Sequence, residues 1–209
     1  MEIELLKELC RIPGAPGFES KIRKFILDEI SHLVDEISTD ALGNIIAIKK
    51  GISTKKLLFT AHMDEIGFIV QHIDDEGFIR FLPLGGFDPK TLSSQRVLIH
   101  GVKDILGVMG TKPIHLMSLE ERNKCPLIKD YFIDTGLPKA ELEKSIQIGD
   151  PITRERDLVQ MGRCINAKSL DNRISVYTLI QIIKRLNNVP TDITVHFAFT
   201  VQEEVGLRG

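Results

Sequence analysis

Two carboxylates, Glu203 and Glu204, follow an apolar run of β-branched and aromatic residues at 195–201. Such a run predicts a buried strand. Adjacent residues on a strand point to opposite faces, so both glutamates can serve one site only if the strand ends before them. Gly206 just beyond gives the chain freedom to turn. Open α/β sheets bind ligands at the carboxyl ends of their strands, so the pair marks a candidate site. The alternative is a solvated acidic turn.

His62 and Asp64 follow a second apolar run, residues 56–61, which predicts a central buried strand. The two side chains share a face in extended chain, because they are two positions apart. The carboxylate can then accept a hydrogen bond from the ring nitrogen that does not bind a metal. Asp171 lies directly before the helical pattern of residues 172–186. Taken alone, a His-x-Asp pair is more often structural, and an Asp before a helix is usually an N-cap.

Together these residues suit a divalent metal ion, because a histidine with several carboxylates is a donor set for Zn²⁺, Co²⁺ or Mn²⁺. A carboxylate has two oxygens and can bridge two ions ~3.5–4 Å apart. One of the adjacent glutamates would bind metal, and the other would take a proton from the attacking water as general base. The residues therefore predict a metal-dependent hydrolase.

The composition restricts the class of protein. The chain has 209 residues, 43% of them hydrophobic, which is enough for one domain or for a core with an inserted module. A formal net charge of −2 with scattered Lys and Arg predicts neither a nucleic-acid nor an anionic-membrane partner. No apolar run approaches the ~20 residues that span a bilayer. Three cysteines without CxxC spacing and an N-terminus without a signal-peptide pattern predict a cytoplasmic protein with no disulfide framework.

The order of elements predicts an α/β layer interrupted by a β-rich insert. Helical patterns at 2–10 and 19–32 precede short strand patterns at 34–39 and 44–49, an order that fits an α/β catalytic layer. From residue 66, strands of about five residues with tight turns predict a small barrel or sandwich. The expected strands of the insert are 68–73, 78–82, 96–100, 105–109 and 131–134.

Two further segments of the insert differ in texture. Residues 118–124 are polar and unpatterned, which predicts a mobile loop, and residues 138–145 fit a short helix. From about residue 161 the sequence again shows the patterns of helices and buried strands, so the insert is expected to end there.

Several motifs make a resemblance specific. Thr60–Gly67, Ala167–Arg173 and Phe199–Gly209 resemble signatures of the M42 family of metal-dependent aminopeptidases, some of whose members are labelled glutamyl aminopeptidase or endoglucanase. The similarity also covers the insert, and therefore runs over essentially the whole chain. The insert motifs are residues 85–89, 96–101 and 107–117.

The resemblance implies a three-layer α/β catalytic domain of the zinc-peptidase type, formed by residues 1–67 and 161–209, with an inserted β-barrel at 68–160. It implies two divalent ions per subunit, most typically Zn²⁺ or Co²⁺, and peptide substrates. It also implies a homo-oligomer, often a tetrahedral dodecamer built from dimers, in which the insert serves assembly and substrate access.

The resemblance also implies a role for each candidate residue. His62 binds one metal, Asp171 bridges the two, and Glu204 is a ligand of the other. Glu203 acts as general acid/base, and Asp64 orients His62.

The family continues beyond the position of Gly209, and its further Asp and His ligands lie in that C-terminal part, which is absent here. We therefore expect this chain to bind at most one metal weakly and to lack peptidase activity, with strand 194–201 as an unpaired edge or a bare face. One alternative is a catalytically inactive assembly or binding subunit. Another is a glycoside hydrolase, whose two carboxylates flank a sugar, although that chemistry has no need of His62 and Asp171.

Overall fold

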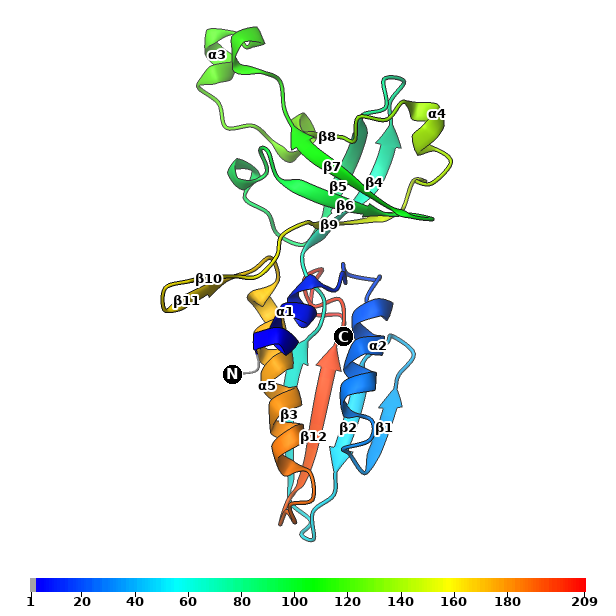
Figure 1. Cartoon of the computed structure of the whole chain (residues 1–209), viewed down its shortest axis with the longest axis vertical. Coiled ribbons are helices and arrows are strands. Elements are labelled where there is room, and N and C mark those ends of the chain that lie inside the picture. The colour runs from blue at the N-terminus through cyan, green and yellow to red at the C-terminus, as the bar shows by residue number, and fades with distance from the viewer. Residues whose placement is uncertain (1–2) are drawn as a thin grey trace. The chain divides into compact units, whose positions relative to one another are not determined.

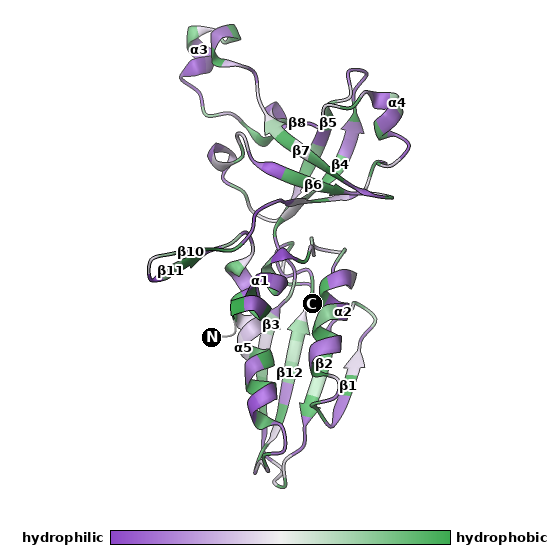
Figure 2. Cartoon of the chain, in the orientation of Figure 1, coloured by the Kyte–Doolittle hydropathy of each residue, from purple (hydrophilic) through white to green (hydrophobic). Residues whose placement is uncertain are grey.

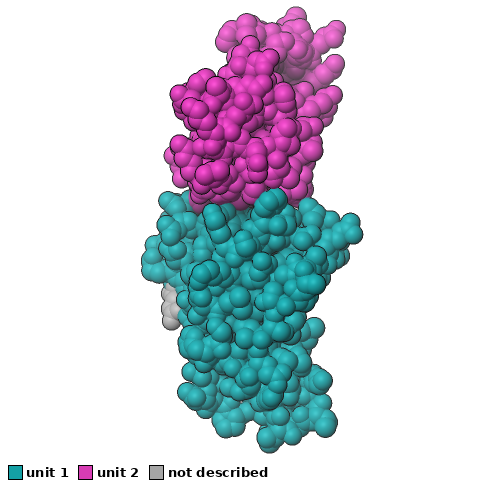
Figure 3. Space-filling view, turned by 90° about the vertical axis from the view of Figure 1, so that its right-hand side faces the viewer, with its two compact units in different colours: residues 1–65, 157–209 teal, residues 66–156 magenta. Residues whose placement is uncertain are grey.

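The computed structural model describes residues 3–209 and divides into two units. One unit holds the residues up to Glu65 together with 157–209, and the other holds 66–156; they are coloured teal and magenta in Figure 3. The chain leaves the first unit after one strand and returns to it before a short hairpin and a helix, so the second unit is an insert (Figure 1).

Within the described residues, the first unit has three helices, and each buries one apolar stripe. In α2 the buried residues are Ile22, Ile26 and Ile30, spaced four apart as a helix with one covered face requires. The polar residues fall on the other face, so α2 and α5 carry both colours in Figure 2. The helices are α1 Ile3–Arg11, α2 Ser20–Ile30 and α5 Leu170–Leu186.

A four-stranded sheet in the order β1-β2-β12-β3 lies against these helices. Strand β12 pairs antiparallel with β2 and parallel with β3, so β3 and β12 end at the same edge, with Thr200 opposite His62. The strands are β1 Glu36–Thr39, β2 Ile45–Lys49, β3 Lys56–His62 and β12 Thr194–Thr200.

Two expectations about strand position are wrong. Of the two alternatives expected for β12, the unpaired edge is wrong because β12 is an inner strand, whereas one of its faces has no helix over it within residues 3–209. Strand β3, expected to be central, pairs only with β12 among the described residues. The first three residues of β3 are exposed, although its sequence Lys56-Leu-Leu-Phe is mostly apolar. Hydrophobicity predicts that a strand exists, but it does not say which strands lie beside it.

The helices all pack on one face of the sheet. Val195, Phe197 and Phe199 of β12 are buried in the same apolar cluster as the helix stripes. The opposite face carries Ala198 and its register partners Ile46 and Thr60, and no helix covers it within residues 3–209 (Figures 1 and 2). The α/β class expected from the sequence is confirmed.

The insert is a closed six-stranded barrel in the order β4-β5-β8-β7-β6-β9, which confirms the expected small barrel. In β7, Ile105 and Met109 are buried while Leu106 and Val108 are exposed, the alternation of a strand with one face on a core. The strands are β4 Gly67–Ile73, β5 Ile79–Leu84, β6 Arg96–His100, β7 Asp104–Gly110, β8 Phe132–Asp134 and β9 Pro151–Arg154.

Some short elements were not expected. Strand β9 closes the barrel, and a two-stranded hairpin of β10 (Val159–Met161) and β11 (Cys164–Asn166) follows the insert. The segment expected to be a loop contains α3, Leu119–Arg122, which a Ser118 and Glu121 capping box begins. Helix α4, Lys139–Leu142, confirms the short helix expected within residues 138–145. The other short helices are η1 Pro89–Thr91, η2 Ile114–Leu116 and η3 Ile128–Asp130.

Candidate functional site

The candidate residues stand where parallel strands β3 and β12 end and helix α5 begins. His62 is the last residue of β3, and Glu203 follows the end of β12 by three positions. Asp171 lies at the start of α5, where it and Asn172 have non-helical backbone angles. Because β3 and β12 pair parallel and in register, their carboxyl-terminal ends lie together. They form one edge of the sheet that runs across the strand ends, as expected for a site in an α/β layer.

All five residues singled out from the sequence lie together at this edge. The Nε2 atom of His62 lies 3.1 Å from Oδ1 of Asp171 and 3.8 Å from Oε2 of Glu203. Its Nδ1 atom lies 3.4 Å from Oδ1 of Asp64. One possible ligand atom each from His62, Glu203 and Glu204 lies within 4.8 Å of the others.

The carboxylates around His62 control its charge. Burial lowers the pKa of the ring, but contacts with Asp64, Glu203 and Asp171 outweigh that effect and raise it to about 9. For Glu204 the dominant effect is burial, which raises the pKa of its carboxyl group. This edge of the sheet therefore has a negative field that favours a cation.

Asp64 is fully buried and connects the two strand ends. Its Oδ1 and Oδ2 atoms accept hydrogen bonds from the backbone N–H groups of Glu203 and Glu204, each at 3.1 Å. Burial works to raise the pKa of Asp64, but the His62 ring and these two N–H donors hold it below its usual range. Asp64 therefore remains an anion that contacts both the histidine and the acidic turn.

The acidic turn, residues 201–206, departs from strand geometry immediately after β12. Gln202 has a left-handed backbone, with φ of 52°, and residues 204–206 form a turn. The expectation that the strand ends before the two glutamates is confirmed. Because of this change of direction, both Glu203 and Glu204 can reach the His62 side of the edge.

Asp171 does not act as an N-cap. The cap position of α5 is Ser169, which has no side-chain cap hydrogen bond, while the Asp171 side chain is 85% exposed with Oδ1 toward His62. An exposed carboxylate beside a histidine is accessible to a ligand from solvent.

Sequence reasoning did not assign a role to several charged residues beneath the site. Lys168 and Glu65 form a buried ion pair between the segments that carry Asp171 and Asp64. Arg173 is fully buried and donates to the backbone carbonyl of Met63 at 2.8 Å. The sequence signal was that Lys168 and Glu65 are charged residues within the motifs 167–173 and 60–67. Their burial, which only the structure shows, distinguishes this ion pair from a solvated one.

The donor set fits a divalent metal ion. The imidazole nitrogen and several carboxylate oxygens converge within reach of one another, which is the combination that Zn²⁺, Co²⁺ and Mn²⁺ accept. The residues that could hold an ion are His62, Asp171, Glu203 and Glu204.

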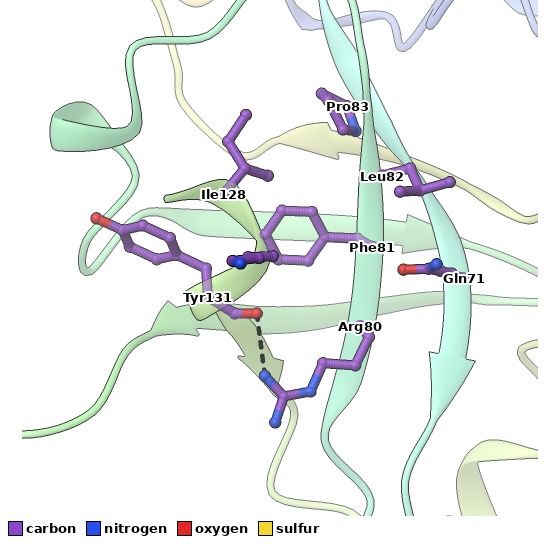
Figure 4. A pocket seen from close by; sticks show the side chains of 8 residues that line it. Gln71, Arg80, Phe81, Leu82, Pro83, Ile128 and Tyr131 are labelled. Atoms are coloured by element: carbon purple, nitrogen blue, oxygen red, sulfur yellow. Dashed lines mark hydrogen bonds between the residues drawn. The ribbon is translucent and has the colours of Figure 1, made fainter. Parts of the chain in front are cut away.

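A pocket of the barrel has a different character. It has a volume of about 480 Å³, and Arg80 Nη1 donates to the backbone carbonyl of Tyr131 at 3.3 Å on its wall (Figure 4). Among the described residues, no carboxylate, histidine or thiol lines it, so these walls offer no typical metal donor. The lining residues are Gln71, Arg80, Phe81, Leu82, Pro83, Ile128, Lys129 and Tyr131.

Comparison with known proteins decides the family. The profile of the M42 glutamyl aminopeptidase family matches residues 43–209. The chain belongs to the M42 peptidase family. Within this family the lysyl aminopeptidase of Pyrococcus furiosus is 35% identical over 212 residues, covering 99% of this chain and 60% of that protein.

Solved M42 structures share the fold over the whole chain. An aminopeptidase of the archaeon Desulfurococcus kamchatkensis matches with a TM-score of 0.92 at 35% identity, covering 99% of this chain and 57% of the other. The TET1 peptidase of Pyrococcus horikoshii, described as assembling into a tetrahedron or a large octahedral shell, matches with a TM-score of 0.90 at 37% identity, covering 99% and 63%. The chain spans about 60% of the length of the curated relatives that it matches. No helix within residues 3–209 is long and apolar enough to cross a membrane.

Proposed function

We propose that this chain carries part of the catalytic centre of a metal-dependent aminopeptidase that removes N-terminal residues from short peptides. The observation that supports this best is the group of carboxylates around Nε2 of His62, with Asp171 at 3.1 Å and Glu203 at 3.8 Å. Relatives named lysyl and glutamyl aminopeptidase support the reaction class.

His62, Asp171 and Glu204 hold the metal in this proposal. Asp171, whose carboxylate is exposed, would serve both ions, with His62 as a ligand of one ion and Glu204 as a ligand of the other. When bound, Zn²⁺ or Co²⁺ supplies a Lewis acid that polarises the peptide carbonyl and lowers the pKa of water.

Glu203 moves the proton. Its Oε2 atom takes a proton from the attacking water and passes it to the amine that leaves. The side chain is about one-third exposed and lies beside His62 without a lysine or arginine partner within 4 Å among residues 3–209, so a water molecule can reach it.

Asp64 positions the other groups. Its Oδ1 atom faces Nδ1 of His62, so Nε2 is left for the metal, and its two oxygens hold the N–H groups of Glu203 and Glu204.

Metal binding and hydrolysis test this function. We expect Co²⁺ to bind this chain at the candidate site, His62→Ala to abolish that binding, and His72→Ala, in barrel strand β4, to leave it unchanged. Equal effects of both variants would contradict the site. Aminoacyl anilides and a cellulose derivative, offered in parallel, separate a peptidase from the glycoside-hydrolase alternative.

This chain supplies only two protein ligands to each ion, because Asp171 is counted twice, whereas a catalytic zinc usually has three. We therefore expect at most one weakly held metal after dialysis and no turnover of leucyl or glutamyl anilides. That outcome also fits the alternative of an inactive assembly subunit, which co-assembly with an active relative would reveal. Two tightly held metals with turnover would contradict the expectation and would indicate ligands from a neighbouring subunit.

Assembly through the insert belongs to the same proposal. The barrel exposes Leu106 and Val108 side by side on β7, and apolar strips of that kind mark contact surfaces. The shell described for the Pyrococcus horikoshii TET1 peptidase supports a homo-oligomer here as well.

A further inference from the structure

Glu19 is a buried carboxylate that the proposed reaction does not use. Only 3% of the residue is exposed. It stands directly before helix α2, at the N-cap position, yet its side chain makes no cap hydrogen bond to that helix. Burying a carboxylate is costly unless it is hydrogen-bonded, so its partners indicate what the residue is for.

The partners of Glu19 belong to the loop before α2 and to the acidic turn. Its Oε1 atom accepts hydrogen bonds from the N–H of Gly17 at 2.8 Å and from the N–H of Gln202 at 3.1 Å. The second bond joins residues 183 positions apart and reaches the one non-glycine residue between β12 and Glu203 that has a left-handed backbone.

Glu19 is one of three side chains that hold consecutive N–H groups of this turn. Asn44 Oδ1 accepts from the N–H of Val201 at 3.0 Å, directly before Gln202. Asp64 accepts from the two N–H groups directly after it. Every backbone N–H from residue 201 to residue 204 therefore has a side-chain acceptor from another element.

The turn needs this support for a physical reason. A left-handed backbone is unfavourable at a residue with a side chain, and it persists only where the surroundings determine it. Without Glu19, the N–H of Gln202 would lose its acceptor in a part-buried place, and the chain would gain by relaxing toward extended geometry. Extended geometry points Glu203 and Glu204 to opposite faces.

We propose that Glu19 is a positioning residue, which fixes the backbone at Gln202 so that Glu203 and Glu204 face His62 together. The inference rests on the proposed function for its catalytic meaning. The order of the turn itself is independent of that function and can be measured on this chain.

Amide hydrogen exchange tests the positioning role directly. In Glu19→Ala we expect the Gln202 amide to exchange at least about tenfold faster, as expected when a hydrogen bond to a charged acceptor is lost. Glu19→Gln keeps an acceptor oxygen in the same place and should restore most of the protection. Glu29→Ala is the matched control, because Glu29 lies on helix α2, which Glu19 directly precedes, and it pairs with Lys184 at 2.8 Å. It should leave Gln202 unchanged.

Co²⁺ titration provides the second measurement. We expect Glu19→Ala to weaken Co²⁺ binding about tenfold and to alter the visible absorption of the bound ion, which a loss of general stability would not do. If Glu19→Ala fails to fold, Glu19→Met fills a similar volume without an acceptor and takes its place.

Unchanged exchange at Gln202 in Glu19→Ala or Glu19→Met overturns the proposal, as does faster exchange spread evenly over β12 and α2. If the wild-type chain binds no Co²⁺, the proposed metal site fails for this chain. The exchange of the Gln202 amide then decides the role of Glu19 alone.

Discussion

At the scale of single residues, the two adjacent glutamates have different surroundings that suit different roles. The Glu203 carboxylate approaches Nε2 of His62 to 3.8 Å, while burial raises the pKa of Glu204. A carboxylate that must lose its proton to bind a cation gains most from a metal nearby. In the proposed division, Glu204 is the ligand and Glu203 transfers the proton.

Paired amide substitutions test that division. Glu203→Gln keeps the shape of the side chain but cannot accept a proton. In an active protein that has the full length of the relatives, turnover should therefore fall by ~10²–10⁴-fold while metal content hardly changes. Glu204→Gln should instead lower metal occupancy. Metal analysis beside anilide kinetics provides the measurement. Equal metal loss in the two variants, or an active Glu203→Gln, would contradict the roles.

At the scale of elements, a buried ion pair connects the end of β3 to the start of α5. Glu65 comes directly after Asp64, and Lys168 lies three positions before Asp171; their side chains are 1% and 4% exposed. The pair holds together the two segments that bring a carboxylate to each side of His62.

Removing one partner of this pair should be strongly destabilising. Lys168→Met removes the ion-pair partner of the buried Glu65 carboxylate, for which the expected loss in unfolding free energy is ~3–5 kcal/mol. Lys184→Met is the control, since it removes a half-buried pair with Glu29 and should cost about 1 kcal/mol or less. Urea unfolding measures both, and a double variant Glu65→Leu with Lys168→Met should recover much of the loss. Similar small losses in unfolding free energy for both lysine variants would show that the buried pair stabilises the fold no more than the partly exposed pair does.

The position of β3 leads to a second prediction at this scale. Its Leu58 is 62% exposed, and the strand pairs only with β12 among the described residues. A long exposed apolar edge promotes association between chains. Leu58→Lys should therefore raise the soluble fraction of this 209-residue chain, measured by centrifugation and static light scattering. Ile52→Lys, in the loop before the strand, should change it little.

At the scale of the whole molecule, the chain combines a catalytic-type unit with a barrel that has its own core. The buried residues of the barrel form a cluster separate from that of the first unit. A unit with its own core can evolve a surface for assembly without disturbing a site elsewhere. The exposed strip on β7 is the candidate for that surface.

A charge within this strip should weaken assembly. We expect Leu106→Glu to lower the oligomeric state at micromolar concentration, because it places a carboxylate in an apolar contact. Val102→Glu, in the exposed turn between β6 and β7, is the control. Multi-angle light scattering at several dilutions measures the effect. A wild-type chain that is already a monodisperse monomer would contradict assembly through the insert.

The sequence by itself predicted most of the elements and the set of candidate site residues. Apolar runs ending in acidic residues predicted β3 and β12, and residue spacing predicted α2, α5 and most barrel strands. His62, Asp64, Asp171, Glu203 and Glu204 were identified because side-chain type limits what a site can do. Helix α3 was missed because its signal is four residues long, and β9 because it directly follows a turn.

Only the tertiary structure decided neighbours and burial. That β12 lies inside the sheet and β3 at its edge depends on pairing between distant segments, which local hydrophobicity does not encode. That Glu19 reaches Gln202, and that Glu65 meets Lys168, depends on the chain having folded, because these contacts join residues more than 100 positions apart. From the sequence alone, a charged residue is predicted to be exposed to solvent. Burial and hydrogen-bond partners, which are properties of the fold, make these carboxylates part of the site.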